Sequence, residues 1–152
     1  MITWQSLRFE ALNTHQLFEL LKLRVDVFVV EQECAYPELD EKDRHSDTHH
    51  LLGWENDKLV AYARLLPPGL SYPSVSIGRV VISGANRKKG AGKALIAQAI
   101  AKCALLWPNQ AIEIGAQAYL LDFYQAFGFE TTSSMYLEDG IPHVDMKRAP
   151  TQ

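Results

Sequence analysis

An apolar strand, a glycine-rich basic loop and an alanine-rich helix follow one another in this chain, and their order constrains the fold more than any other feature. The strand is expected over residues 74–83, the loop over 84–92 and the helix over 93–106, where Pro108 ends it. The loop then lies at the carboxyl end of a strand, where ligands of α/β proteins bind. The sequence therefore predicts an α/β fold with a ligand site at one edge of a sheet.

Hydrophobic periodicity predicts two further helices and a set of short strands around this unit. One helix starts at Asn13 or Thr14 and continues through Arg24 or beyond, and the other covers residues 119–127. At 152 residues the chain has the length of one domain, so we expect residues 1–152 to form a single α/β (mixed α+β) domain with helices on the faces of its sheet. Its other strands are expected at residues 51–55, 58–65, 111–116, 129–137 and 143–147.

The composition excludes several other classes of protein. With 47% hydrophobic residues and a net charge of −3, the chain is typical of folded, soluble proteins and has no general attraction to nucleic acid. No apolar run approaches the ~18 residues that a membrane helix needs. We therefore expect a cytoplasmic protein without nucleic-acid or membrane partners, and leave a homodimer open. Cys34 and Cys103 are far apart and lack the spacing of a metal site, so we expect free thiols and no bound metal.

The loop over residues 84–92 has the composition of an anion-binding site. Gly90 and Gly92 let the backbone approach a ligand closely, and the helix behind them directs free N–H groups and a partial positive charge at the same place. Cationic side chains around the turn favour a strongly charged anion such as a pyrophosphate. These cations are Arg87, Lys88, Lys89 and Lys93.

Two common nucleotide-binding motifs do not fit this loop. A Walker loop needs a hydroxyl residue after its lysine, whereas Lys93 is followed by Ala94. A dinucleotide fingerprint needs a third glycine, but the position three residues after Gly92 is Leu95. The loop is therefore expected to hold its pyrophosphate in another way.

Two segments resemble motifs of the GNAT acetyltransferase superfamily. Arg87-x-x-Gly90-x-Gly92, between an apolar strand and an alanine-rich helix, is similar to the acetyl-CoA loop of that superfamily. Residues 123–129, which contain Tyr124 followed by glycine and phenylalanine, look like its Tyr-x-x-x-Gly-Phe segment. The run over residues 24–32, with Cys34, Tyr36, Glu38 and Asp40, is similar to the ElaA-like branch.

The resemblance implies a sheet geometry and a cosubstrate. Members of the superfamily have a central mixed, mostly antiparallel sheet with a splayed parallel pair of strands and helices on both faces. The backbone of the first splayed strand binds the pantetheine arm and thioester of acetyl-CoA, and the loop and helix behind it bind the pyrophosphate. On this chain the strand positions are Val80, Val81 and Ile82, and the loop positions are Arg87, Lys88, Lys89, Gly90, Ala91, Gly92 and Lys93.

The resemblance also implies direct transfer of an acetyl group to an amine in a ternary complex. Tyr124 matches the tyrosine that many members place near the thioester sulfur, where a phenol with a pKa of about 10 can protonate the leaving thiolate. Glu113 is the candidate base beside the cosubstrate strand, although its alternation with two isoleucines also fits an ordinary outward-facing residue. Arg24, Glu31 and Gln32 are expected to shape the acceptor pocket.

Several alternatives stay open at this point. Residues 31–47 carry seven acids and two bases, which predicts a solvated loop or a rim that faces the substrate. The chain could also be a CoA-binding sensor or interaction module with little transferase activity, although the presence of the tyrosine argues against that. Rival candidates for the base are Glu31, Glu38, His49 and His50, and Ser76 stands where histone-acetylating relatives have a glutamate.

Overall fold

The sheet in this computed structural model contains a hairpin of two strands, β2 (His49–Glu55) and β3 (Lys58–Leu66). The structure describes residues 1–87 and 89–151. Asn56 and Asp57 connect the two strands with positive φ angles of 50° and 65°. Two consecutive residues with positive φ give a turn whose twist matches that of the flanking strands, so the predicted tight hairpin is confirmed.

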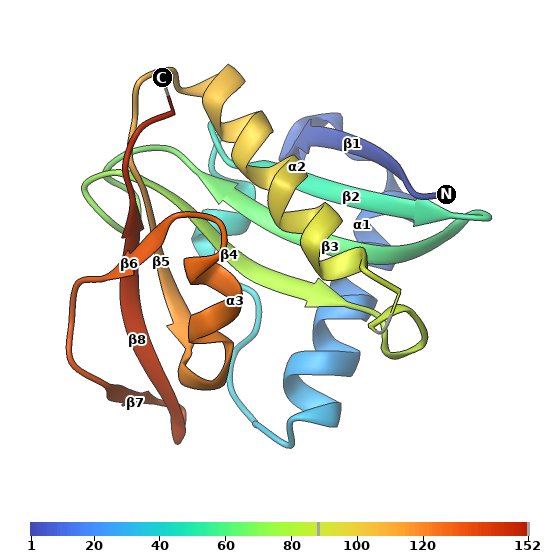
Figure 1. Ribbon diagram of the computed structural model, residues 1–152. Coiled ribbons are helices and arrows are strands. Elements are labelled where there is room, and N and C mark those ends of the chain that lie inside the picture. Colours follow the sequence, from blue (N-terminus) through green and yellow to red (C-terminus); the bar gives the residue numbers. More distant parts are fainter. Residues whose placement is uncertain (88, 152) are drawn as a thin grey trace.

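The other strands extend the sheet on both sides of this hairpin. They are β1 (Thr3–Arg8), β4 (Val75–Ile82), β5 (Ile112–Gln117), β6 (Phe129–Thr131), β7 (Tyr136–Glu138) and β8 (Ile141–Arg148). The strand order is β1-β2-β3-β4-β5-β8-β6, and β7 also pairs with β8 (Figure 1). Each of these pairs is antiparallel except β4 with β5, which confirms the predicted mixed, mostly antiparallel sheet.

Helices cover both faces of the sheet. They are α1 (Thr14–Arg24), α2 (Ala91–Leu106) and α3 (Leu121–Gln125). In Figure 1, α2 and α3 lie in front of the sheet and α1 lies behind it. Within residues 1–87 and 89–151, no helix is both long and apolar enough to cross a membrane.

Helix α1 begins where the sequence predicts. The Asn13 side chain accepts a hydrogen bond of 2.7 Å from the backbone N–H of Gln16, and the Gln16 side chain accepts one of 2.9 Å from the N–H of Asn13. This reciprocal capping satisfies two N–H groups that a helix start leaves free. Past Arg24 the chain continues as a π-helical segment, Val25–Glu31, which the helical periodicity did not distinguish from α1.

Some other elements differ from the prediction. No strand is predicted at β1, because only Trp4 and Leu7 in it are strongly apolar, and it is an edge strand held by backbone pairing with β2. Residues 129–137 form β6 and the start of β7 instead of one strand, since each pairs with a different part of β8. The helix predicted over residues 119–127 is shorter, because a 3₁₀ turn occupies its start and α3 ends at Gln125.

Each face of the sheet has its own apolar core. Ile112, Ile114 and Ala116 alternate along β5 into the core beneath α2 and α3, so the intervening β5 side chains point to the opposite face. On that opposite face, Leu20 of α1 packs with residues of β2, β3 and β4. Helix α1 therefore covers one half of its face, and the half formed by β5 and β8 is left to line a cleft.

The parallel strands β4 and β5 pair only where they begin. Val75 lies opposite Ile112 and Ser76 lies opposite Glu113, and no later residue of β4 is paired with β5 in the described chain. Because both strands continue for several residues, they splay apart from Ile77 onward. The splayed parallel pair that the family resemblance implied is therefore present.

Buried ion pairs fasten the loop after α1 to the sheet. The fully buried Arg24 places Nε 2.7 Å from Oε2 of Glu38 and Nη1 2.7 Å from Oδ1 of Asp43. Arg64 of β3 donates to Asp40 at 2.7 Å and to Asp43 at 2.9 Å. A buried guanidinium requires such partners, because an unpaired charge away from water is strongly destabilising. The acidic loop thus belongs partly to the core, and the prediction of a merely solvated loop is wrong for Glu38 and Asp43.

His50 extends this network while remaining neutral. Its Nε2 donates to the carbonyl oxygen of Asp43 at 2.8 Å, and its Nδ1 accepts from the hydroxyl of Tyr62 at 2.6 Å. Burial lowers the pKa of His50 to about 4. Burial alone would raise the pKa of Asp43, but the hydrogen bond and charge of Arg24 and the charge of Arg64 lower it to about 2.

We expect the protein to lose stability as the pH falls below about 6.5. Between pH 6.5 and about 4 the unfolded chain protonates His50 and the folded chain does not, so falling pH favours unfolding by about 3 kcal/mol in all. Below pH 3.8 the unfolded chain protonates Asp43 first, and the loss continues toward pH 2. Chemical denaturation at a series of pH values should show the free energy of unfolding falling in both of these pH intervals.

The His50→Gln variant separates the two contributions. It should flatten the pH dependence between 6.5 and 4 and leave the loss below 4 in place, whereas His15→Gln, at an exposed position on α1, should follow the wild-type curve. If the stability of His50→Gln depended on pH as that of the wild type does, the loss between pH 6.5 and 4 could not be assigned to His50.

Candidate active site

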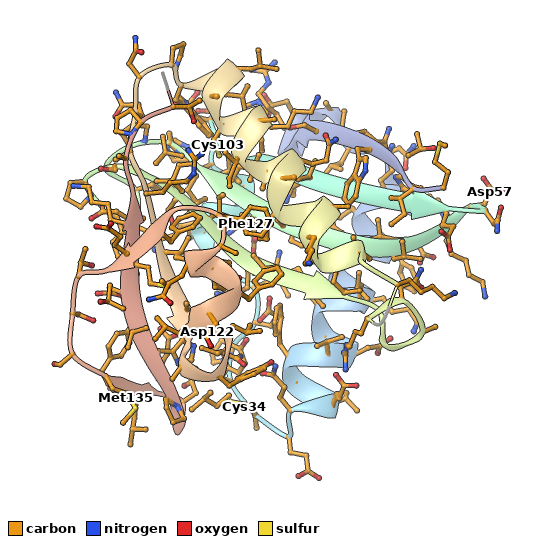
Figure 2. All side chains as sticks on the ribbon, viewed as in Figure 1. Cys34, Asp57, Cys103, Asp122, Phe127 and Met135 are labelled. Atoms are coloured by element: carbon orange, nitrogen blue, oxygen red, sulfur yellow. The ribbon has the colours of Figure 1, made fainter. Side chains whose placement is uncertain are left out.

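A cleft of about 870 Å³ opens where β4 and β5 part. Its floor is formed by these two strands, and its walls are the segment after α1 and the hairpin of β7 and β8. The walls meet at the lower edge of the molecule, where Cys34 is labelled in Figure 2. The Cys34 Sγ there lies 3.9 Å from the carbonyl oxygen of Asp139. Segments more than a hundred residues apart in sequence therefore enclose one space.

The N-terminus of α2 lies at the end of the cleft near the basic loop. Gly90 caps the helix with a φ of 76°, a conformation that strains residues with a side chain. Gly92 lines the cleft, and a Cβ built on it would lie 3.8 Å from the ring of Phe123. Since the N–H groups in the first turn of a helix have no partners within the helix, they are available to an anion in the cleft.

The residues predicted to bind the cosubstrate fall into three groups. Val80, Val81, Ile82, Arg87 and Gly92 line the cleft. Lys89, Gly90, Ala91 and Lys93 belong to the loop or the first turn of α2 without lining it. Lys88 lies outside the described residues.

Arg87 joins the basic loop to the segment after α1. Its Nη1 donates to Oε1 of Glu31 at 2.9 Å, its Nη2 donates to the other oxygen of the same carboxylate, and its Nε donates to the carbonyl oxygen of Ile82 at 3.2 Å. The hydrogen bond from Arg87, together with its charge, lowers the pKa of Glu31. Glu31 thus has a protein partner at the mouth of the cleft.

Tyr124 of α3 is one of the tyrosines that line the cleft. Its side chain is buried in the α2–α3 core and lines the cleft, with the rings of Phe123 and Phe129 edge-on at centroid distances of 5.2 and 5.9 Å. Burial, aided by nearby Tyr119, raises the pKa of Tyr124 to about 12. The hydroxyl therefore remains protonated at neutral pH and can donate a proton or a hydrogen bond.

The other predicted site residues lie in different places. Glu31 and Gln32 line the cleft, whereas Arg24 is fully buried and does not line it. Its partner Glu38 accepts hydrogen bonds from Tyr36 and Arg79, which do line the cleft. Glu113 does not line the cleft, and its Oε2 accepts a hydrogen bond of 3.1 Å from the backbone N–H of Ser74. The structure thus brings two of the three acceptor candidates to the cleft.

Tyr72, Tyr136 and His143 line the cleft, and the sequence analysis missed them. The hydroxyls of Tyr72 and Tyr136 both donate to Oδ1 of Asp145, at 3.0 and 2.7 Å. They converge above Gly115, where an added Cβ would lie 3.1 Å from each hydroxyl oxygen. His143 lies on the same strand and also lines the cleft. The alternation of His143 with Asp145 was the available signal, but the sequence did not show that their face borders the cleft.

Comparisons with known proteins agree with this geometry. The family model for the acetyltransferase (GNAT) domain matches residues 19–150. The chain belongs to the GNAT acetyltransferase family. Protein ElaA of Escherichia coli K12 is 46% identical over 152 residues, which are 100% of this chain and 99% of ElaA. The ElaA-like character that residues 24–40 indicated is therefore confirmed.

Two solved structures are similar to this GNAT chain along nearly its whole length. The crystal structure of Escherichia coli ElaA matches with a TM-score of 0.92, covering 97% of this chain and 99% of that one. An acyl-CoA N-acyltransferase from Pseudomonas aeruginosa matches with a TM-score of 0.94 at 42% identity, covering 98% of this chain and 100% of that one. Acyl transfer from CoA is accordingly the reaction class of this GNAT protein.

We expect Gly92→Trp to abolish CoA binding, because an indole at this position would fill the space between the helix start and the ring of Phe123. Isothermal titration with CoA should show at least a 100-fold loss of affinity. The matched control is Gly84→Trp in the same loop, where an added Cβ meets nothing within 4 Å and the residue does not line the cleft. Equal affinities for the two variants would rule out this location for the cosubstrate.

Proposed function

We propose that this protein transfers the acetyl group of acetyl-CoA directly to an amine bound in the same cleft. The observation that carries the proposal is the gap between β4 and β5, which has Tyr124 on one side and the start of α2 at one end. Such a gap exposes strand backbone beside a protonated phenol and a set of free N–H groups. These are the groups that a CoA thioester needs for binding and for cleavage of its C–S bond.

The donor half of the cleft comprises β4 and the start of α2. Beyond Ser76, the edge of β4 that faces β5 has no strand partner in the described chain, so its backbone can bind the pantetheine arm along Val80, Val81 and Ile82. An N–H in this stretch can also stabilise the oxyanion that forms on the thioester carbonyl; loss of one such donor costs on the order of 3 kcal/mol. The pyrophosphate is proposed to lie at residues 87–93.

Tyr124 is proposed to be the general acid. The neutral amine nitrogen attacks the thioester carbonyl carbon, the C–S bond breaks, and the phenol gives its proton to the departing thiolate. The raised pKa of Tyr124 keeps the proton available at the start of each turnover. The attacking nitrogen loses its own proton to a base, for which the sequence offers Glu113 as a candidate.

An amine suits the acceptor half of the cleft because the wall of β7 and β8 is acidic. Glu138 and Asp139 line the cleft, and Asp145 lies behind the two tyrosine hydroxyls. Within the described residues, no lysine or arginine nitrogen lies within 4.0 Å of these three carboxylates. The wall therefore attracts a cationic acceptor and disfavours one that carries a carboxylate.

We expect Tyr124→Phe to lower kcat about 100-fold or more while the Kd for acetyl-CoA changes less than threefold, because only the proton donor is removed. Release of free CoA thiol in the presence of a panel of primary amines measures the rate, and titration calorimetry measures the binding. Tyr119→Phe is the control, since it removes a largely exposed hydroxyl from the same cleft.

A CoA-binding sensor is the competing function. It requires tight binding of acetyl-CoA without amine-dependent thiol release in the wild-type protein. That result would replace the transferase proposal, whereas amine-dependent release that Tyr124→Phe leaves intact would remove only the role of the tyrosine.

A further inference from the structure

His143 of β8 lines the cleft with its imidazole ring. Its position on that strand places it across the gap from Tyr124. Val144 and Met146 of β8 pack into the core beneath α2 and α3, so His143 and Asp145 point to the opposite face of the sheet. Tyr124 packs in that α2–α3 core. The phenol and the imidazole therefore approach the cleft from opposite faces of the sheet.

The level of His143 along the strands matches that of the proposed thioester site. Ser76 and Glu113 are partners, and four residues further along each strand lie Val80 and Gln117. His143 is the antiparallel partner of Gln117. Since strands rise by similar amounts per residue, His143 lies near the level at which β4 is proposed to hold the thioester.

The hydrogen bonds of His143 define which nitrogen can accept a proton. Its Nδ1 lies 2.7 Å from the carbonyl oxygen of Ile141. Because a carbonyl oxygen only accepts hydrogen bonds, Nδ1 carries the proton of the neutral ring, and Nε2 is left with a lone pair. This arrangement is that of a general base whose tautomer is held by the backbone.

A carboxylate and an aromatic ring lie beside Nε2. The carboxylate of Glu138 lies 3.4 Å from Nε2, and the ring of Tyr136 stacks on the imidazole at a centroid distance of 6.0 Å. On the same face, Asp145 accepts hydrogen bonds from the hydroxyls of Tyr72 and Tyr136. Asp139, in the turn between β7 and β8, adds a further negative charge to this wall. An imidazolium formed here has a partner in Glu138.

We propose that His143 is the general base of the acetyl transfer and that Glu138 is a positioning residue that stabilises its protonated form. The inference rests on the proposed function. The acceptor N–H gives its proton to Nε2 of His143 as the C–N bond forms, the C–S bond breaks, and Tyr124 protonates the sulfur. The proton on His143 then returns to the phenolate of Tyr124 through solvent, which restores both groups and leaves the amide and CoA thiol as products.

The test is the pH profile of kcat with saturating acetyl-CoA and saturating 1,4-diaminobutane or butylamine, so that ionisation of the free amines does not enter the profile. His143→Gln should lower kcat about 100-fold at neutral pH and remove the acidic limb of the profile, with the Kd for acetyl-CoA unchanged. Glu138→Gln should keep the limb and move it to lower pH, because the imidazolium loses its carboxylate partner. His15→Gln on α1 is the matched control and should behave as the wild type.

Other outcomes distinguish this inference from the proposed function. A retained acidic limb in His143→Gln, or its loss in Glu113→Gln instead, would overturn the role of His143 while acetyl transfer itself stands. A wild-type protein that acetylates neither amine would overturn the proposed function and the inference together. Nitrogen-15 spectra of the imidazole give a check without turnover: the neutral ring of His143 should carry its proton on Nδ1, and a proton on Nε2 would exclude the base.

Discussion

The buried guanidinium of Arg24 is the constraint on which the cleft depends. It holds Glu38 and Asp43 at 2.7 Å, and Glu38 in turn accepts a hydrogen bond of 2.9 Å from Arg79 of β4. Removing one partner from such a buried set costs about 3–5 kcal/mol, because the remaining charges stay away from water without compensation. An acidic loop that would otherwise be free in solvent thereby becomes a fixed wall beside β4, and Tyr36 donates to Glu38 at 2.6 Å to complete it.

The same interaction supports the gap between the parallel strands. Arg79 has a φ of 50°, an unfavourable conformation for a residue with a side chain, and the pairing of β3 with β4 shifts register opposite it. A bulge of this kind bends a strand and increases its local twist. The hydrogen bonds between Arg79 and Glu38 hold the strained residue in place, so the ion network, the bulge and the departure of β4 from β5 are parts of one arrangement.

The sequence predicted residues at the end of the cleft near α2 and missed those of the wall of β7 and β8 for a physical reason. The loop at Gly90 and Gly92 is local, since its glycines, cations and helix start are consecutive. The wall at His143 and Asp145 is assembled across strands, and only the register of β8 with β5 shows that it faces the cleft. The fold was predictable because hydrophobic periodicity is also local. Strand β1 was not predicted, because an edge strand is held by backbone pairing and has little hydrophobic pattern of its own.

The asymmetric cover of the sheet explains how one cleft can take two ligands. Helix α2 covers its face and directs its N-terminus at the gap, so the phosphate-bearing donor that we propose would be bound from the side that also holds Tyr124. On the other face α1 packs only on β2 to β4, and β5 and β8 carry polar side chains into the open half. A donor and an acceptor can therefore meet at the gap from opposite faces, which is the geometry that direct transfer requires.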